Sequence, residues 1–238
     1  MSNEIGIIMA AGLGTRMAPL TQKVPKPLIK VYEQPMIETV INSLERRNVK
    51  HIYIVVGYLG EQFEYLTKKY SNISLVKNAE YMTKNNISSI YAVADIMKTA
   101  DCFICEADLF IGDRSIFDNE PKQSCYFGKM VNGYSNDWVF DLDNNGRIIR
   151  IGKCGTDTYN MVGISYFKQK DAEIIANAII DAYKQEGHEQ LYWDEVVNTQ
   201  LDKLNLVISP VNEHQIIELD SVEELKAFDP NYEKYNVR

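Results

Sequence analysis

The sequence predicts an α/β protein with a Rossmann-like, mixed but mainly parallel sheet flanked by helices, followed by a β-rich second half. First, short β-branched runs alternate with segments of helical periodicity up to about residue 120. This alternation is typical of parallel strands joined by crossover helices. Second, a glycine-rich loop directly follows the first apolar run. Third, apolar runs follow one another closely beyond residue 120, which indicates a different arrangement there.

The first half alternates strands and helices. Residues 4–10 predict a strand that runs into the glycine-rich loop, and HIYIVV at 51–56 predicts a second strand that ends at Gly57. Between them, apolar residues recur at helical spacing after Pro35, a residue that suits the first turn of a helix. The elements predicted here are helices over 35–46, 61–70 and 86–97 and further strands over 74–77 and 102–107.

The second half is richer in strands. Asp143-Asn-Asn-Gly146 predicts a tight turn between two of them. The predicted strands are 124–130, 137–142, 147–151, 160–167, 205–208 and 215–219, and the predicted helices are 170–183, 190–201 and 221–228. The chain of 238 residues shows no linker, repeat or low-complexity tract. We therefore expect one domain over 1–238, with halves of about 1–120 and 121–238.

Composition and charge exclude several classes of protein. The formal net charge is −8, which argues against nucleic-acid binding through a basic surface. The longest apolar run falls far short of the roughly 20 residues of a membrane span, so we expect no membrane insertion. Glu4 precedes the first apolar run, unlike in a signal peptide. A cytoplasmic protein is therefore expected, while its oligomeric state stays open, a homodimer included.

Two cysteines form a CxxC motif, which raises zinc binding or redox chemistry as alternatives. Cys102 and Cys105 lie in a segment that reads as a buried strand. Residues three apart on a strand point to opposite faces, so the two sulfur atoms should not converge. No second CxxC and no paired histidines follow. The motif therefore predicts two core residues.

The loop at 11–31 carries the main functional signal. Gly12 and Gly14 allow backbone N–H groups to approach an anion closely. The segment holds Arg16 and three lysines, including Lys26, but no acidic residue, although the chain as a whole is acidic. Open α/β sheets bind ligands where such loops leave the strands. The loop therefore predicts a polyphosphate site, with Arg16 suited to bidentate contacts and Lys26 to a reacting phosphoryl group.

Two familiar phosphate motifs do not fit this loop. A dinucleotide fingerprint requires a third small residue at position 17, which is Met17. A P-loop requires Gly-Lys-Ser/Thr at its end, and that tripeptide is absent here. The remaining alternative is a surface turn with solvated lysines, which the spaced arginine and the Pro-Lys-Pro segment disfavour.

The stretch GLGTRMAPLTQKVPKPLI resembles the signature loop of the nucleoside-diphosphate-sugar pyrophosphorylase superfamily. Further segments, among them Leu191-Tyr-Trp-Asp194 and Ile217-Glu-Leu-Asp-Ser221, are similar to those of bacterial CTP:phosphocholine cytidylyltransferases. The resemblance implies a nucleotide-diphospho-sugar transferase fold with a nucleotide-binding first half and an acceptor-binding second half. It implies nucleotide binding by Ala10, Ala11, Gly12, Gly14, Thr15, Arg16, Lys26, Gly57, Tyr58, Asn86 and Ser88.

The same resemblance assigns Asp108 and Asp220 to a Mg²⁺ ion. Both residues follow predicted strands, and one or two carboxylates with phosphate oxygens are a common magnesium site. From the sequence alone, Asp220 is equally suited to be the N-cap of the last helix. The run Glu106-Ala-Asp108 departs from the choline enzymes, which have an aspartate at the first acidic position.

The implied reaction transfers CMP from CTP to phosphocholine, giving CDP-choline and pyrophosphate. The acceptor phosphate attacks the α-phosphorus in line, and Lys26 and Arg16 stabilise charge on the phosphates, with Asp108 and Asp220 completing the catalytic set. No general base is needed, because a phosphate dianion is already a nucleophile. The alternative of a non-catalytic nucleotide-binding module is disfavoured, because binding alone does not require two acidic residues.

The acceptor pocket is expected among aromatic and acidic residues of the second half. A quaternary ammonium has no N–H to donate, so it is recognised by aromatic faces and carboxylates. The residues implied are Trp138, Tyr192, Trp193, Asp194 and Glu218. Each tryptophan is equally well explained as a core residue. A primary ammonium, as in 2-aminoethylphosphonate or phosphoethanolamine, would prefer carboxylates, and a sugar 1-phosphate is less compatible with so aromatic a segment.

Overall fold

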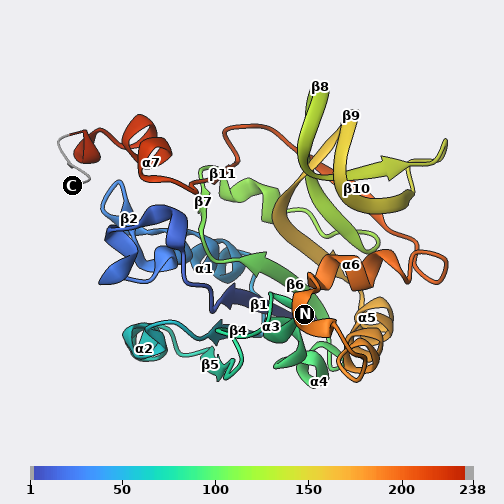
Figure 1. Cartoon of the computed structure of the whole chain (residues 1–238), viewed down its shortest axis with the longest axis horizontal. Coiled ribbons are helices and arrows are strands. Elements are labelled where there is room, and N and C mark those ends of the chain that lie inside the picture. Colours follow the sequence, from blue (N-terminus) through green and yellow to red (C-terminus); the bar gives the residue numbers. More distant parts are fainter. Residues whose placement is uncertain (1–2, 234–238) are drawn as a thin grey trace.

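A computed structural model describes residues 3–233, and its centre is a seven-stranded mixed sheet (Figure 1). The spatial order is β10 (Val207–Val211), β8 (Cys125–Leu142), β9 (Ile148–Phe167), β6 (Asp101–Glu106), β1 (Glu4–Ala10), β4 (His51–Val56) and β5 (Ile73–Lys77). The strands β6, β1, β4 and β5 are parallel, β9 is antiparallel to both β6 and β8, and β10 is parallel to β8. The predicted α/β class with a mainly parallel first half is confirmed.

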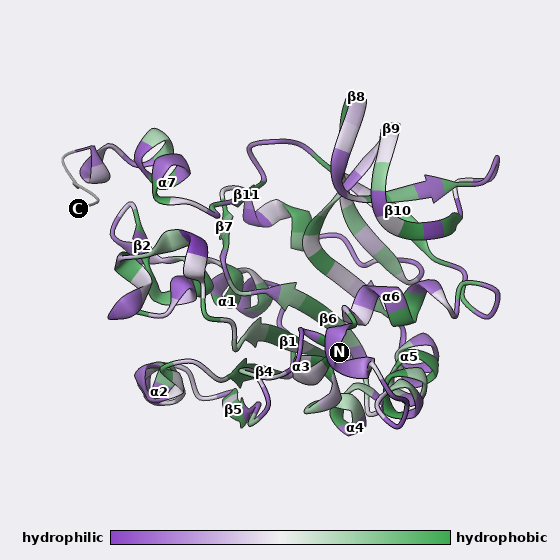
Figure 2. Ribbon diagram, viewed as in Figure 1, coloured by the Kyte–Doolittle hydropathy of each residue, from purple (hydrophilic) through white to green (hydrophobic). Residues whose placement is uncertain are grey.

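Helices cover both faces of the sheet. They are α1 (Met36–Arg46), α2 (Glu64–Lys69), α3 (Ile87–Tyr91), α4 (Ala94–Met97), α5 (Gln169–Ala182) and α6 (Trp193–Asn198). The helix α7 (Val222–Phe228) lies apart from the sheet and belongs to a separate hydrophobic cluster with Met17 and Ile29. Successive residues of β1 point to opposite faces, so Ile7 belongs to the same hydrophobic cluster as Ile175 of α5, while Ile8 belongs to the cluster that includes Ile37 of α1. The two hydrophobic clusters thus share the central strands, which Figure 2 shows as strongly hydrophobic.

The two cysteines of the CxxC motif lie on opposite faces of β6, as predicted. Cys102 belongs to the cluster under α5 and Cys105 to the cluster under α1, and both are fully buried. Burial raises the pKa of both thiols above the usual range, so each stays protonated and unreactive. The motif is therefore part of the core.

The largest difference from the predicted elements is in the second half. The four strands expected between 124 and 167 are two long bent strands, β8 and β9, whose register shifts several times along their length. Together they form an arm that rises from the sheet (Figure 1). Polar residues and glycine at 132–136 interrupt the hydrophobic alternation, which made one bent strand look like two.

One short strand that matters for the site, β7 (Leu109–Ile111), was not predicted. It pairs antiparallel with β11 (Ile216–Glu218), which lies within the strand predicted over 215–219, so segments more than 100 residues apart lie side by side. The helix expected over 86–97 is divided into α3 and α4, and the helix expected over 190–201 begins only at Trp193. A small hairpin, β2 (Lys30–Val31) and β3 (Gln34–Pro35), lies beside α7. Within residues 3–233, no helix is long and apolar enough to span a bilayer.

Candidate active site

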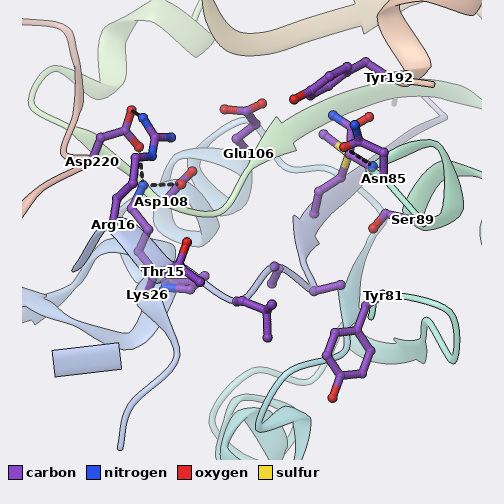
Figure 3. Close-up of a pocket in the computed structure, with 18 of the residues that line it drawn as sticks. Thr15, Arg16, Lys26, Tyr81, Asn85, Ser89, Glu106, Asp108, Tyr192 and Asp220 are labelled. Atoms are coloured by element: carbon purple, nitrogen blue, oxygen red, sulfur yellow. Dashed lines mark hydrogen bonds and ion pairs between the residues drawn. The ribbon is translucent and has the colours of Figure 1, made fainter. Parts of the chain in front are cut away.

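A pocket of about 780 Å³ opens at the carboxyl ends of β1 and β6 (Figure 3). The loop after β1 lines it, and so do residues of the β8–β9 arm. Segments from the whole chain contribute, namely residues 9–16, 26–27, 78–89, 106–108, 136–138, 192–194 and 218–220. This is the crevice where open α/β sheets bind ligands.

The glycine-rich loop has the backbone geometry that the sequence suggested. Gly14 adopts a left-handed conformation with φ of 62°, and a Cβ atom at this position would lie 2.7 Å from Cβ of Lys26. Only glycine meets both conditions without strain. The hydroxyl of Thr21 donates to the carbonyl of Gly14 at 3.0 Å, and the hydroxyl of Tyr58 donates to the carbonyl of Thr21 at 2.9 Å. The loop is therefore held in place from behind.

Lys26 is the centre of an ion-pair network at one end of the pocket. Its Nζ donates to Oδ2 of Asp108 at 2.6 Å and to Oδ1 of Asp220 at 2.5 Å. Arg16 Nη1 lies 2.7 Å from the other oxygen of Asp220 (Figure 3). Burial opposes the charged form of Lys26, but the two carboxylates outweigh it and raise its pKa, so the ammonium persists at neutral pH. The structure thus brings all four predicted catalytic residues together.

The pairing of β7 with β11 explains why the two aspartates meet. Asp108 precedes β7 and Asp220 follows β11, so the antiparallel pair places them at the same end. The N-cap interpretation of Asp220 is wrong, because Ser221 caps α7 and its side chain accepts from the backbone N–H of Glu224. The Asp220 carboxylate is therefore available to Lys26 and Arg16.

The oxygen atoms of Asp108 and Asp220 also suit a magnesium ion. Both carboxylates already converge on one cation, the Lys26 ammonium. In residues 3–233 no group of three or more histidine, cysteine or acidic side chains is arranged to hold a metal. Two carboxylates completed by substrate phosphates and water are nevertheless the usual way in which proteins hold Mg²⁺. The donor set therefore fits this ion.

Small polar side chains form the far wall of the pocket. Asn78 donates to the hydroxyls of Ser88 and Ser89 at 2.9 and 3.2 Å, and the side-chain oxygen of Asn86 accepts from the backbone N–H of Trp193 at 2.9 Å. Nine of the residues predicted to bind nucleotide line the pocket, namely Ala10, Ala11, Gly12, Gly14, Thr15, Arg16, Lys26, Asn86 and Ser88.

Gly57 and Tyr58, predicted to bind nucleotide, are not among the lining residues. A Cβ at Gly57 would lie 2.7 Å from the ring of Tyr81, so this glycine makes room for Tyr81, while Tyr58 supports the loop through its bond to Thr21. Both residues therefore act behind the pocket wall. Sequence reasoning missed Tyr81, Lys84, Asn85 and Ser89, which line the pocket. The polar run from Lys84 to Ser89 was the signal that could have found three of them.

The aromatic residues of the predicted acceptor site separate into two environments. Trp138 and Tyr192 line the pocket, with ring centroids 5.4 Å apart at 60°. Trp193 is 3% exposed, and its ring packs against Tyr126 and Phe167 in the core. Because Trp193 begins α6, its side chain turns inward while Tyr192 stays at the pocket. The expectation that Trp193 forms part of an aromatic cage is therefore corrected.

We expect Trp193→Leu to act on stability and not on acceptor binding. Replacing a buried aromatic ring by a smaller side chain leaves a cavity, so the free energy of unfolding should fall by roughly 2–4 kcal/mol. Urea denaturation measures this loss, and acceptor titration at low temperature measures binding by the folded fraction. If the variant is as stable as the wild type but binds the acceptor much more weakly, Trp193 is an acceptor-binding residue after all.

Acidic groups gather at the acceptor end of the pocket. Asp194 is 4% exposed and accepts from the hydroxyl of Tyr126 at 2.9 Å, while burial raises its pKa to about 7. Glu218 faces the open pocket, and desolvation followed by the nearby Asp108 and Asp220 raises its pKa to about 7. Burial, with Asp108 and Glu218 close by, raises the pKa of Glu106 well above its ordinary value. A bound ammonium would favour the ionised forms of these carboxyls and could donate hydrogen bonds to them.

Tyr126 should position Asp194, which gives a second prediction. Tyr126→Phe removes the hydroxyl that orients the carboxylate, and a hydrogen bond to a charged group contributes about 1.5–3 kcal/mol. We therefore expect the KM of a cationic acceptor to rise by roughly tenfold, with little change in the KM of the nucleotide. Steady-state kinetics checks this, with Tyr134→Phe on the exposed arm as the control. Equal changes in both Michaelis constants would argue against the positioning role.

Known proteins that resemble this chain are nucleotidyl transferases. The nucleotidyl transferase family model matches residues 5–125. A 2-aminoethylphosphonate cytidylyltransferase of Lancefieldella rimae is 59% identical over 226 residues, covering 95% of this chain and 92% of the relative. A choline-phosphate cytidylyltransferase of Haemophilus influenzae is 34% identical and covers 96% of this chain and 99% of the relative.

Solved structures agree with the fold. The structure of a CTP:phosphocholine cytidylyltransferase from Streptococcus pneumoniae aligns with a TM-score of 0.87 and 31% identity, covering 96% of this chain and 99% of that chain. A putative glucose-1-phosphate thymidylyltransferase from Bacillus anthracis aligns with a TM-score of 0.77 and 18% identity, covering 99% and 97%. The first neighbour supports both fold and family, and the second supports the fold.

Proposed function

The chain belongs to the nucleotidyl transferase family and resembles its cytidylyltransferases throughout its length, and from that membership we propose that it transfers CMP from CTP to 2-aminoethylphosphonate. Pyrophosphate is the second product. This acceptor was an alternative in the sequence analysis, where phosphocholine was the main expectation. The relative with 59% identity is named for 2-aminoethylphosphonate, whereas those named for choline phosphate are 34% and 32% identical.

The acidic cluster is the observation that carries the choice of acceptor. Asp194, Glu106 and Glu218 border the pocket, whereas only Trp138 and Tyr192 remain of the three expected rings. A primary ammonium can donate hydrogen bonds to several carboxylates at once, and a quaternary ammonium cannot. The composition of the pocket therefore favours the aminophosphonate.

The reaction is an in-line displacement at the α-phosphorus of CTP. An oxygen of the phosphonate forms the new P–O bond, and the bond from the α-phosphorus to the bridging oxygen of the β-phosphate breaks. The phosphonate dianion needs no general base, so the protein contributes positioning and electrostatic stabilisation. Lys26 lies deep in the pocket, where its ammonium neutralises charge that develops between acceptor and α-phosphate. Arg16 is exposed at the rim, where it can hold the leaving phosphates.

Asp108 and Asp220 would hold Mg²⁺ in this proposal. When bound, the ion supplies charge neutralisation for the triphosphate and the leaving pyrophosphate. Lys26 currently connects the two carboxylates, so it also keeps them oriented toward the phosphates. The glycine-rich loop would supply backbone N–H groups to the phosphates.

Phosphocholine remains the second candidate acceptor, and the ring pair of Trp138 and Tyr192 is the observation that favours it. The two candidates are separated by pyrophosphate release with CTP and Mg²⁺ across 2-aminoethylphosphonate, phosphoethanolamine and phosphocholine. We expect the highest kcat/KM with 2-aminoethylphosphonate and little release when CTP is replaced by ATP, GTP or UTP. A clear preference for phosphocholine would contradict the proposed acceptor.

The proposed role of Asp194 predicts a pH dependence. Its pKa of about 7 means that the carboxyl gains a proton as the pH falls below 7 and then no longer attracts an ammonium. We expect kcat/KM for 2-aminoethylphosphonate to fall between pH 8 and pH 6 more steeply than for ethylphosphonate. Ethylphosphonate lacks the amine and is the control, and because the ammonium lowers the second pKa of the phosphonate, each profile is first corrected for the fraction of acceptor present as dianion. Parallel profiles for the two acceptors would contradict this role.

A further inference from the structure

A lysine of the arm lies against the aromatic pair of the acceptor pocket. Nζ of Lys153 is 6.0 Å from the ring centroid of Trp138 and 5.7 Å from that of Tyr192. Lys153 is paired directly with Trp138 across β8 and β9, which puts the two side chains on the same face of the arm. The lysine is exposed, and it is not among the residues that line the pocket, whereas both rings are.

The surroundings of Lys153 indicate what its charge does. Within residues 3–233 it forms no ion pair, so the two rings are its described partners for the positive charge. A ring pair attracts a cation through the negative potential of its faces. Here the ammonium of Lys153 already interacts with the faces of both rings. A second cation bound to the same pair from the pocket would be repelled by the first.

The charge of Lys153 should affect the binding of the two candidate acceptors to different extents. A trimethylammonium group depends on aromatic faces, because it has no N–H to give to a carboxylate. A primary ammonium instead finds Asp194 and Glu218 at the same end of the pocket. The charge of Lys153 therefore costs binding energy chiefly to the quaternary acceptor.

We infer that Lys153 is a specificity-determining residue that disfavours quaternary-ammonium acceptors by occupying the aromatic pair formed by Trp138 and Tyr192. The inference rests on the proposed function, since 2-aminoethylphosphonate is the acceptor that such selection would protect. Lys153 is not among the residues that line the pocket, so in this inference it sets the preference through the rings and not through catalysis.

The test is Lys153→Met, which keeps a long side chain but removes the charge. Intrinsic tryptophan fluorescence reports phosphocholine binding at Trp138, and steady-state kinetics gives kcat/KM for both acceptors. We expect phosphocholine to bind about fivefold more tightly to the variant, as the release of one exposed cation–π contact would allow. The kcat/KM ratio of phosphocholine to 2-aminoethylphosphonate should rise by a similar factor. Lys153→Arg should keep the wild-type ratio, and Lys203→Met, on the exposed surface, is the control for loss of a lysine.

The outcomes separate this inference from the proposed function. If Lys153→Met binds phosphocholine no more tightly than the wild type, the Lys153 inference is overturned, whichever acceptor the wild type prefers. If the wild type releases no pyrophosphate with 2-aminoethylphosphonate, the proposed function fails, and the phosphocholine titration still decides the role of Lys153. If Lys203→Met raises the kcat/KM ratio of phosphocholine to 2-aminoethylphosphonate as much as Lys153→Met does, the effect is one of overall charge, and the Lys153 inference is also overturned.

Discussion

Asp108→Asn should lower turnover by roughly 10²- to 10³-fold while leaving the fold intact. The asparagine has nearly the same shape and keeps an oxygen that can accept from Lys26, so the network loses a charge and little volume. The lost carboxylate is a proposed ligand of Mg²⁺, and a metal that neutralises phosphate charge contributes several kcal/mol to transition-state stabilisation. Pyrophosphate release at saturating CTP and acceptor measures the effect.

The control for this variant is Asp181→Asn. Asp181 lies on the exposed surface of α5 and pairs with Lys184, so the same chemical change there should leave turnover unaltered. Thermal unfolding of both variants checks that the fold is retained. Near-normal turnover of Asp108→Asn at saturating Mg²⁺ would remove Asp108 from the metal site.

Lys26→Met should reduce kcat by about 10²- to 10³-fold and change CTP binding much less. The side chain is buried between Asp108 and Asp220, and methionine fills a similar volume without the charge. Preorganised charge that acts on the transition state lowers the barrier without tightening the ground state. Asp108 and Asp220 raise the pKa of Lys26, so Lys26 should stay protonated between pH 7 and pH 9. Its deprotonation should therefore cause no loss of activity in that range.

The split between kcat and KM decides the role of Lys26. A rise in the KM for CTP with unchanged kcat would show that Lys26 only binds the nucleotide. Lys30→Met is the matched control, because Lys30 lies in the same segment but is exposed and pairs only weakly with Glu33. That variant should keep wild-type kinetics.

The phosphate end of the site could be predicted because its signal is local. Gly14, Arg16 and Lys26 lie in one short segment, and the turn at Gly14 is held by Thr21 of the same segment. The strand ends that carry Asp108 and Asp220 were also readable, since each follows an apolar run. Their meeting depends on the pairing of β7 with β11. The strand β11 lies within the predicted strand over 215–219, but β7 has only three residues and leaves no periodicity to recognise.

The acceptor end was harder to predict because it depends on which way single side chains turn. Tyr192 and Trp193 are neighbours, yet one lines the pocket and the other lies in the core. The difference is set by where α6 begins, and helix boundaries are poorly determined by sequence. Lys153 was not identified at all, because its partner Trp138 is found only once the bent strands β8 and β9 are in register.

The central claim, a CTP-dependent enzyme that selects 2-aminoethylphosphonate, is tested most directly by competition. CTP and Mg²⁺ are mixed with the wild-type protein and equal concentrations of 2-aminoethylphosphonate and phosphocholine, and ³¹P NMR follows both cytidylyl products in one tube. The ratio of initial rates equals the ratio of the two kcat/KM values, independent of enzyme concentration. We predict that the cytidylyl ester of 2-aminoethylphosphonate forms at least tenfold faster. Predominant CDP-choline, or neither product, would contradict the claim.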